Sequence, residues 1–243
     1  MKTGIIVQCR YNSTRLPGKI LKKVLDKPLL QYLIERLKKT KLADSICIAY
    51  TENKSDLKIK NLIDKLNVES FVGSEHDVLS RHYHCAKKYN YKNIVRVTSD
   101  CPIIDPKIID ELIENFNIDK NLDYLTNGAN ENNRTFPLGM EAEIFNFESL
   151  EYSHLNSSNK YEREHVTIFI KKSHKFKKKY LKLKNNLNHL RLTLDTQEDY
   201  DLISEVIKGI YPNNNYFTMQ NIVTFLKDNP QLININSMIK QVT

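Results

Sequence analysis

Residues 3–19 read TGIIVQCRYNSTRLPGK, an apolar run that changes abruptly into a loop with two arginines, a lysine and several hydroxyl groups. The run is short, rich in branched side chains and bounded by polar residues, which predicts a buried strand. The loop has three interpretations: a solvated turn, a basic contact for nucleic acid, or a cradle for phosphates. The rest of the chain decides among them.

Strand and helix patterns alternate through the N-terminal half. We expect strands at Thr3–Cys9, Ser45–Thr51, Ser70–Val72 and Asn93–Thr98, and helices at Pro28–Lys39, Ser55–Leu66 (with Ser55 as N-cap), Asp77–Tyr89 and Pro106–Phe116. Strands and helices alternating at this interval indicate βαβ units. The prediction is an α/β fold with a mostly parallel central sheet flanked by helices.

The alternation loosens beyond about residue 124. Strand patterns occur at Leu138–Phe147, Tyr180–Leu183 and Leu190–Leu194, and helical patterns at Lys160–Lys172, Glu198–Ile210 and Met219–Lys227. We find no internal repeat or linker. The expectation is a single domain over residues 1–243 with a β-rich excursion at about 124–185.

The composition favours a globular protein with a sizeable core, because 40% of the 243 residues are hydrophobic and 27% are charged. No apolar run approaches the roughly 20 residues that span a bilayer, so we expect no membrane insertion. The N-terminus lacks a signal-peptide pattern. The four cysteines form no CxxC pair, which argues against a zinc site or a disulfide framework and favours a cytoplasmic location.

The net charge of +8 has one main source, the run Lys171–Lys184, which holds eight lysines and no acid. Such a run could attract nucleic acid or anionic lipid. It lacks arginine and has few aromatic residues to stack on bases, so we favour a solvated sheet edge, where lysine also discourages edge-to-edge pairing. No nucleic-acid partner is expected.

Three polar segments follow predicted strands, and the carboxyl ends of parallel strands meet at one edge of a sheet. Arg10, Arg15 and Lys19 follow the first strand, Asp100 follows NIVRVT, and Asp195 follows Leu190–Leu194. The cations suit a triphosphate, and carboxylates at strand ends suit Mg²⁺ bridged to phosphates. For either aspartate alone, a helix cap is the favoured interpretation, and the nearby phosphate loop is what favours Mg²⁺.

Ser13 and Thr14 add hydroxyl donors to the loop, and Gly18 adds flexibility and an accessible N–H. The loop matches neither the Walker pattern nor GxGxxG, and the chain has no GxSxG or HExxH motif. His82 and Cys85 could share a helix face, but His84 would point elsewhere, so a transition-metal site is disfavoured.

The loop RYNSTRLPGKIL resembles the signature of the cytidylyltransferases that activate sugar acids, such as the 3-deoxy-manno-octulosonate and acylneuraminate enzymes. Further segments, GSEHDVLSRHY, VRVTSDCPIIDP, TFPLGMEAEIF, EREHVT and RLTLDTQEDY, resemble the spore-coat polysaccharide biosynthesis protein F family within that group. The resemblance extends from residue 5 to about residue 201.

This resemblance implies a Rossmann-like nucleotide-diphosphosugar transferase fold, a homodimer, Mg²⁺, and a reaction that transfers CMP from CTP to a sugar acid or related sugar for surface glycan synthesis. By position it implies triphosphate contacts from Arg10, Ser13, Arg15 and Lys19, beside which Thr14 adds the hydroxyl donor noted above. It also implies nucleotide contacts from Ser74 and Asp77, Mg²⁺ ligands in Asp100 and Asp195, and acceptor contacts from Glu141, Glu143 and Arg163 to His165.

Two other classes of function stay open at this point. A glycosyltransferase of the same fold would use a nucleotide sugar, but Asp100–Cys101–Pro102 lacks the second acid of a DxD metal motif. A protein that binds nucleic acid or membranes would use the run Lys171–Lys184, and steep salt dependence of binding would reveal it.

Overall fold

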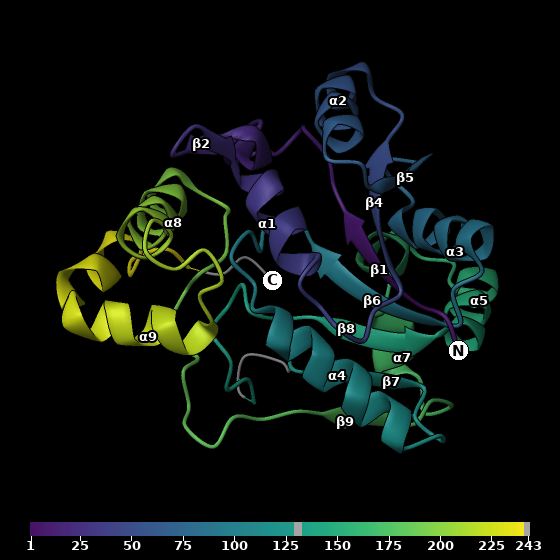
Figure 1. Ribbon diagram of the computed structural model, residues 1–243. Coiled ribbons are helices and arrows are strands. Elements are labelled where there is room, and N and C mark those ends of the chain that lie inside the picture. The colour runs from purple at the N-terminus through teal and green to yellow at the C-terminus, as the bar shows by residue number, and fades with distance from the viewer. Residues whose placement is uncertain (129–132, 241–243) are drawn as a thin grey trace.

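The computed structural model of the protein describes residues 1–128 and 133–240, and its central element is a seven-stranded sheet (Figure 1). Its strands are β1 (Thr3–Gln8), β4 (Ser45–Thr51), β5 (Glu69–Gly73), β6 (Asn93–Thr98), β7 (Tyr124–Thr126), β8 (Glu143–Asn146) and β9 (Lys178–Tyr180). In space they follow the order β5-β4-β1-β6-β8-β7-β9.

The sheet is mostly parallel, as the sequence predicts. Strands β5, β4, β1 and β6 run parallel, β8 is antiparallel to both β6 and β7, and β7 is parallel to β9. In the centre, Ile6 of β1 pairs with Cys47 of β4 and Arg96 of β6. Because β1 is covered on both faces, its apolar residues are continuous rather than alternating.

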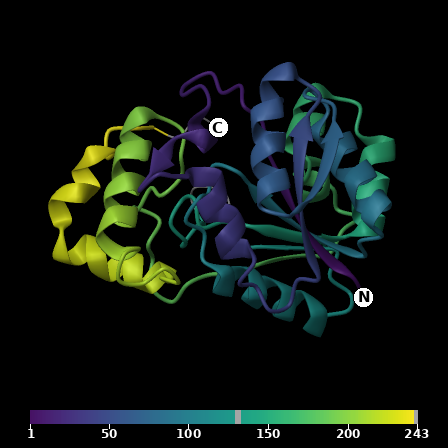
Figure 2. The same cartoon turned by 45° about the horizontal axis from the view of Figure 1, so that its top comes forward.

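Helices cover both faces of the sheet (Figures 1 and 2). Ile5 and Val7 of β1 belong to a core with α1 (Leu29–Leu37), α2 (Leu57–Lys65) and α4 (Pro106–Ile118), whereas Ile6 belongs to a core with α3 (Val78–Tyr89), α5 (Phe147–Asn156) and α7 (Ile168–Lys172). Helix α6 (Lys160–His165) packs on α3, and α8 (Gln197–Ile210) and α9 (Met219–Asp228) pack together beside the first core. Within residues 1–128 and 133–240, no helix has the length and apolar character needed to cross a bilayer.

Short elements connect these layers. Three 3₁₀ helices occur in the described residues, at Lys19–Leu21, Lys54–Asp56 and Pro230–Ile235. Strands β2 (Lys23–Val24) and β3 (Lys27–Pro28) form a small antiparallel pair ahead of α1. The pair belongs to the segment that joins the basic loop to α1.

Several predicted elements differ from the structure. The predicted strand Leu190–Leu194 is wrong: its backbone is irregular, with one isolated bridge from Arg191 to Leu138. The predicted strand Leu138–Phe147 is limited to β8, and the helix α5 that follows it was missed. Ser55 is not an N-cap, because its buried hydroxyl has no hydrogen-bond partner among the described residues.

The predicted helix Lys160–Lys172 is broken into α6 and α7. Val166 adopts a positive φ of 56°, which ends α6, and Thr167 follows it as the N-cap residue of α7. The Thr167 hydroxyl donates to the carboxylate of Glu143 at 2.9 Å. A long-range polar contact, which local periodicity does not report, therefore accompanies the break.

The segment predicted as a β-rich excursion, about residues 124–185, contributes β7, β8 and β9 to the central sheet and also carries α5, α6 and α7. Part of its turn-rich start, residues 129–132, lies outside the described residues. The extent of the domain stays a prediction.

Candidate active site

The basic loop after β1 is anchored by a buried carboxylate. Tyr11 N–H donates to Asp56 Oδ1 at 2.8 Å, and the other oxygen of Asp56 accepts from the N–H and hydroxyl of Thr51 at 2.9 and 2.7 Å. Asp56 is fully buried. Sequence reasoning missed this residue because it assigned the helix cap to the neighbouring Ser55.

Gly18 turns the loop back toward the sheet. Its φ of 66° lies in the left-handed region, and a Cβ atom there would lie 3.0 Å from the ring of Tyr11. Its N–H donates to the Tyr11 carbonyl at 3.0 Å. This turn directs Lys19, the first residue of the following 3₁₀ helix, toward the edge of the sheet.

Two cations of the loop meet two carboxylates from distant parts of the chain. Lys19 Nζ lies 2.9 Å from Asp195 Oδ1 and 4.0 Å from Asp100 Oδ2, and Arg15 Nη2 lies 3.0 Å from Asp195 Oδ1. The convergence that the strand-end argument predicted is therefore present. The Asp195 side chain is 8% exposed and that of Asp100 is 31% exposed.

Asp195 also forms an ion pair with Arg191, a residue that the sequence analysis did not identify as part of the site. Arg191 binds Asp199 through two nitrogens at 2.8 Å and reaches Asp195 Oδ2 at 3.3 Å. Asp199 also belongs to the capping box at the start of α8, with Thr196. Burial by itself raises the pKa of Asp195, but the charges of Lys19, Arg15 and Arg191 outweigh it, so the pKa is lowered from its ordinary value.

Asp100 and Asp195 are neighbours because a backbone hydrogen bond connects the two chain segments that carry them. Leu194 N–H donates to the carbonyl of Asp100 at 2.8 Å, and the Thr193 hydroxyl reaches the same carbonyl at 3.3 Å. Asp195 thus reaches the sheet edge although Leu190–Leu194 is not a strand. Asp100 itself lies two residues past the end of β6.

The remaining loop side chains are available to a ligand. The side chains of Arg10, Ser13 and Thr14 make no hydrogen bond or ion pair with the residues that the structure describes, and Arg10 and Thr14 are exposed. A guanidinium and two hydroxyls without partners, beside Arg15 and Lys19, form a donor set suited to phosphate oxygens.

Ser74 and Asp77 form the turn that starts α3, at the same edge of the sheet. The Ser74 hydroxyl accepts from Asp77 N–H at 3.1 Å, and Asp77 Oδ1 accepts from Ser80 N–H at 2.9 Å. Asp77 Oδ2 pairs with Arg163 Nε at 2.7 Å. The predicted nucleotide segment and the predicted acceptor segment therefore meet in one ion pair.

Glu143 occupies a different position from the one expected. We expected it to face a second substrate, but its buried carboxylate accepts from Tyr124 at 2.6 Å and Thr167 at 2.9 Å and pairs with Arg96 and Lys171. Burial tends to raise its pKa, but the charges of Lys171 and Arg96 prevail and lower it. Both carboxylate oxygens of Glu143 are therefore engaged by groups within the fold.

Of the other sequence candidates, His82 is fully buried, and its Nδ1 lies 2.9 Å from the Val78 carbonyl oxygen. Burial lowers the pKa of His82 to about 3. Cys85 Sγ lies 3.4 Å from Cys47 Sγ. Across residues 1–128 and 133–240, no group of three or more His, Cys, Asp or Glu side chains is arranged to hold a metal ion.

Half of the lysine run is engaged within the fold. Lys171 pairs with Glu143, and Lys172 and Lys175 lie over the rings of Tyr161 and Tyr152. Lys178 donates to two carbonyls at the C-terminal end of α7. The run includes β9, the last strand of the sheet order. This placement agrees with the interpretation as a sheet edge.

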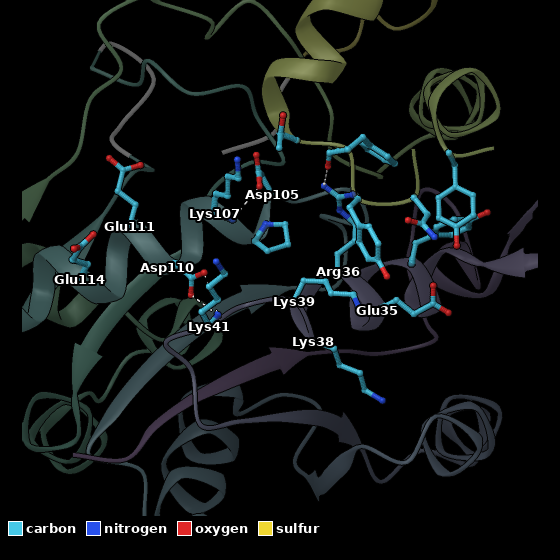
Figure 3. A pocket seen from close by; sticks show the side chains of 17 residues that line it. Glu35, Arg36, Lys38, Lys39, Lys41, Asp105, Lys107, Asp110, Glu111 and Glu114 are labelled. Atoms are coloured by element: carbon cyan, nitrogen blue, oxygen red, sulfur yellow. Dashed lines mark hydrogen bonds between the residues drawn. The ribbon is translucent and has the colours of Figure 1, made fainter. Parts of the chain in front are cut away.

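A cavity of about 690 Å³ lies away from this site, between α1, α4 and the segment 211–218 (Figure 3). Arg36 stands near its centre and donates to the carbonyls of Ile104 and Phe217 at 2.8 Å each, while Glu111 and Glu114 line its far end. None of the site residues expected from the sequence lines this cavity. The chemistry-bearing side chains gather instead at the open edge of the sheet.

Comparisons with known proteins agree on one group. A family model described as "Cytidylyltransferase" matches residues 4–228. A solved cytidylyltransferase of Leptospira borgpetersenii is similar, with a TM-score of 0.92 and 35% identity over 99% of this chain and 100% of that one. An uncharacterised protein of Methanocaldococcus jannaschii is 39% identical over 99% of this chain and 97% of its own length. The spore coat polysaccharide biosynthesis protein SpsF of Bacillus subtilis is 29% identical over 93% and 94%.

Proposed function

Because this chain belongs to the cytidylyltransferase family and is a nucleotidyltransferase, we propose that it transfers CMP from CTP to a hydroxyl of a sugar acid or related sugar, with release of pyrophosphate, for surface glycan synthesis. The observation that carries the proposal is the cation–carboxylate cluster at the edge of the sheet. There Lys19 lies 2.9 Å from Asp195 and 4.0 Å from Asp100.

In the proposed reaction, the acceptor oxygen forms a bond to the α-phosphorus of CTP. The bond from that phosphorus to the bridging oxygen breaks, and pyrophosphate leaves. Arg10, Arg15 and Lys19 would stabilise the charge on the leaving group, and Ser13 and Thr14 would donate to phosphate oxygens. The unpartnered state of Arg10, Ser13 and Thr14 in the described residues supports this role.

The residues present fit a Mg²⁺ ion. Asp100 and Asp195 supply oxygen ligands that already share one positive charge, that of Lys19. Mg²⁺ is commonly held by one or two carboxylates together with waters and substrate phosphates. Asp100 and Asp195 would hold the ion, which when bound offsets the charge of the phosphates.

Ser74 and Asp77 are proposed to line the nucleotide, because they lie in the turn at the start of α3 that shares the sheet edge with the loop. Arg163 fixes Asp77 from the side of α6. A homodimer, which the family resemblance implies, belongs to the same proposal and is tested by analytical ultracentrifugation.

The test is pyrophosphate release from CTP, UTP, ATP and GTP, each with Mg²⁺ and a panel of sugar acids and sugar phosphates. We expect release with CTP, dependent on one class of acceptor, and no comparable release with the other three nucleotides. Glu111→Gln, on the exposed surface of α4, is the matched control and should behave as the unsubstituted protein. Absence of release from CTP with every acceptor would contradict the proposal.

A further inference from the structure

The segment Met140–Glu143 contains two acidic residues with opposite environments. Glu143 is saturated by the buried network of Arg96, Tyr124, Thr167 and Lys171. The Glu141 carboxylate, in contrast, accepts no hydrogen bond from the described residues, and its side chain is 25% exposed. One carboxylate is therefore a structural group, and the other is open to a ligand.

The strand register places Glu141 at the edge that carries the site. Strand β8 is antiparallel to β6, and Glu143 pairs with Arg96. Glu141 precedes this pair by two residues, so it lies toward the end of β6, where Asp100 follows. Glu141 therefore lies near the carboxyl end of β6, at the same edge of the sheet as Asp100, whose charge acts on it.

The backbone on both sides of Glu141 is fixed. The amide of Asn127 donates to the Met140 carbonyl at 2.7 Å and accepts from Ala142 N–H at 2.8 Å. A Cβ atom on Gly128 would lie 3.3 Å from the Cβ of Glu141, so this side chain is packed closely at its base. These contacts fix the position of the Glu141 backbone, while its carboxylate oxygens remain available to accept a hydrogen bond from a ligand.

Arg134 forms an ion pair with Glu141, but a loose one. Arg134 Nε lies 3.5 Å from Glu141 Oε1, too long for a strong hydrogen bond, and this nitrogen is buried without a hydrogen-bond partner among the described residues. Burial raises the pKa of Glu141 to about 7, with Glu143 and Asp100 acting in the same direction and Arg134 and Lys171 opposing it. A carboxylate with a pKa near neutrality can both take up and release a proton.

We propose that Glu141 is the general base of the reaction: it accepts the proton of the acceptor hydroxyl as the oxygen attacks the α-phosphorus. The O–H bond breaks as the O–P bond forms, pyrophosphate leaves with the electrons of the broken P–O bond, and the protonated Glu141 returns its proton to solvent. This inference rests on the proposed function, which by itself names no base.

The first test is the pH dependence of pyrophosphate release from CTP with the acceptor that supports the fastest release. The unsubstituted protein should lose activity about tenfold per unit below about pH 7 and reach a plateau above it. Glu141→Gln should lower the plateau by roughly 10²- to 10⁴-fold and remove the inflection. Its affinity for CTP, measured by calorimetry, should stay within about twofold, because Glu141 acts on the acceptor.

A second variant covers the case in which Glu141→Gln does not fold. Arg134→Gln removes a positive charge that lowers the pKa of Glu141, so the inflection should move to higher pH. Glu111→Gln, exposed on α4, should leave both the rate and the inflection unchanged.

Two outcomes separate this inference from the proposed function. Full activity and an unchanged inflection in Glu141→Gln, or an unmoved inflection in Arg134→Gln, would overturn the base and leave the transferase intact. A wild-type protein that releases no pyrophosphate from CTP with any acceptor would overturn the proposed function and the base together.

Discussion

Replacing Lys19 with methionine should strengthen the binding of free Mg²⁺ while it weakens turnover. In the structure the Lys19 ammonium occupies the space between two carboxylates, 2.9 Å from Asp195 and 4.0 Å from Asp100. Its side chain is 13% exposed, so solvent screens these contacts only in part. Methionine keeps most of the length of the side chain and removes its charge.

The magnitude follows from these distances. Unit charges so spaced attract by roughly 4–6 kcal/mol at an effective dielectric of about 20, before the cost of desolvation. A divalent ion held by Asp100 and Asp195 would be repelled by the same ammonium, and removing the ammonium removes that repulsion. Even if only a quarter of an interaction of this size is recovered, about 1.4 kcal/mol, the affinity for Mg²⁺ changes tenfold. We expect the Kd of Mg²⁺ without nucleotide to fall about tenfold or more, and turnover to fall roughly 10²- to 10³-fold because a cation for the leaving group is lost.

The assay is a calorimetric titration of each nucleotide-free protein with MgCl₂, paired with pyrophosphate release. Lys22→Met is the matched control, because the Lys22 ammonium bonds to the side-chain oxygen of Gln197 and, among the residues that the structure describes, pairs with no carboxylate. Unchanged or weaker Mg²⁺ binding in Lys19→Met would refute the reasoning, since it would mean that Lys19 does not compete for the carboxylate pair in solution.

Three further predictions concern carboxylates. Asp100→Asn should lower Mg²⁺-dependent turnover by about 10²-fold or more with an unchanged circular dichroism spectrum, and retained activity would remove Asp100 from the metal role. Glu143→Gln should lower the free energy of unfolding in urea by about 3–5 kcal/mol at pH 7, because it breaks a buried ionic network. Because the pKa of Glu143 is lowered, this stabilisation is present above about pH 4.5 and is lost as the pH falls. The control Glu148→Gln, at an exposed position, should change the free energy of unfolding by less than about 0.5 kcal/mol. Glu141→Gln should raise the melting temperature by about 5 °C or more at pH 8 and little at pH 5. Because the pKa of Glu141 is raised, the stabilisation by its protonated form is present below about pH 4.5 and is lost as the pH rises through about 7, at about 1.4 kcal/mol per pH unit. An equal shift of the melting temperature at both pH values would contradict the titration of this group.

The parallel part of the sheet could be predicted because its strands are buried on both faces. Ser45–Thr51 and Asn93–Thr98 have the predicted bounds, since an apolar run between polar turns has few other solutions. Leu190–Leu194 shows the limit of this rule: its leucines alternate with Arg191 and Thr193 and the run is mostly buried, yet it makes a single bridge with Leu138. A hydrophobic pattern therefore predicts which residues are buried. It does not predict whether another strand lies alongside to pair with them, because that depends on the tertiary fold.

Helix patterns failed where long-range polar contacts intervene. The break at Val166 accompanies the contact of Thr167 with Glu143, a residue 24 positions earlier. Helix α5 was missed although Asn146 caps it by accepting from Ser149 N–H, because its buried side includes Ser149 and Ser153 and its exposed side includes Leu155. An Asn followed by FES was the available signal.

The candidate site divides in the same way. The meeting of Lys19 and Asp100 could be anticipated from the geometry of the parallel strands β1 and β6. Asp195 joins them as expected but not by the expected route, because Leu190–Leu194 is not a strand and Leu194 is hydrogen-bonded to the backbone of Asp100. The residues that fix them, Asp56 under the loop and Arg191 behind Asp195, act across the fold on partners that no local pattern names. The roles of all these residues in catalysis stay predictions.

The hydrogen bond from Leu194 to Asp100 has a consequence for the biosynthesis of the protein. The carboxylate pair joins a residue near position 100 to one near position 195, and Asp195 is oriented by Asp199 at the start of α8. A nascent chain therefore cannot assemble the pair until α8 has left the ribosome and docked. Partly synthesised molecules would carry the basic loop and Asp100 without Asp195, which makes the completed pair a late marker of folding.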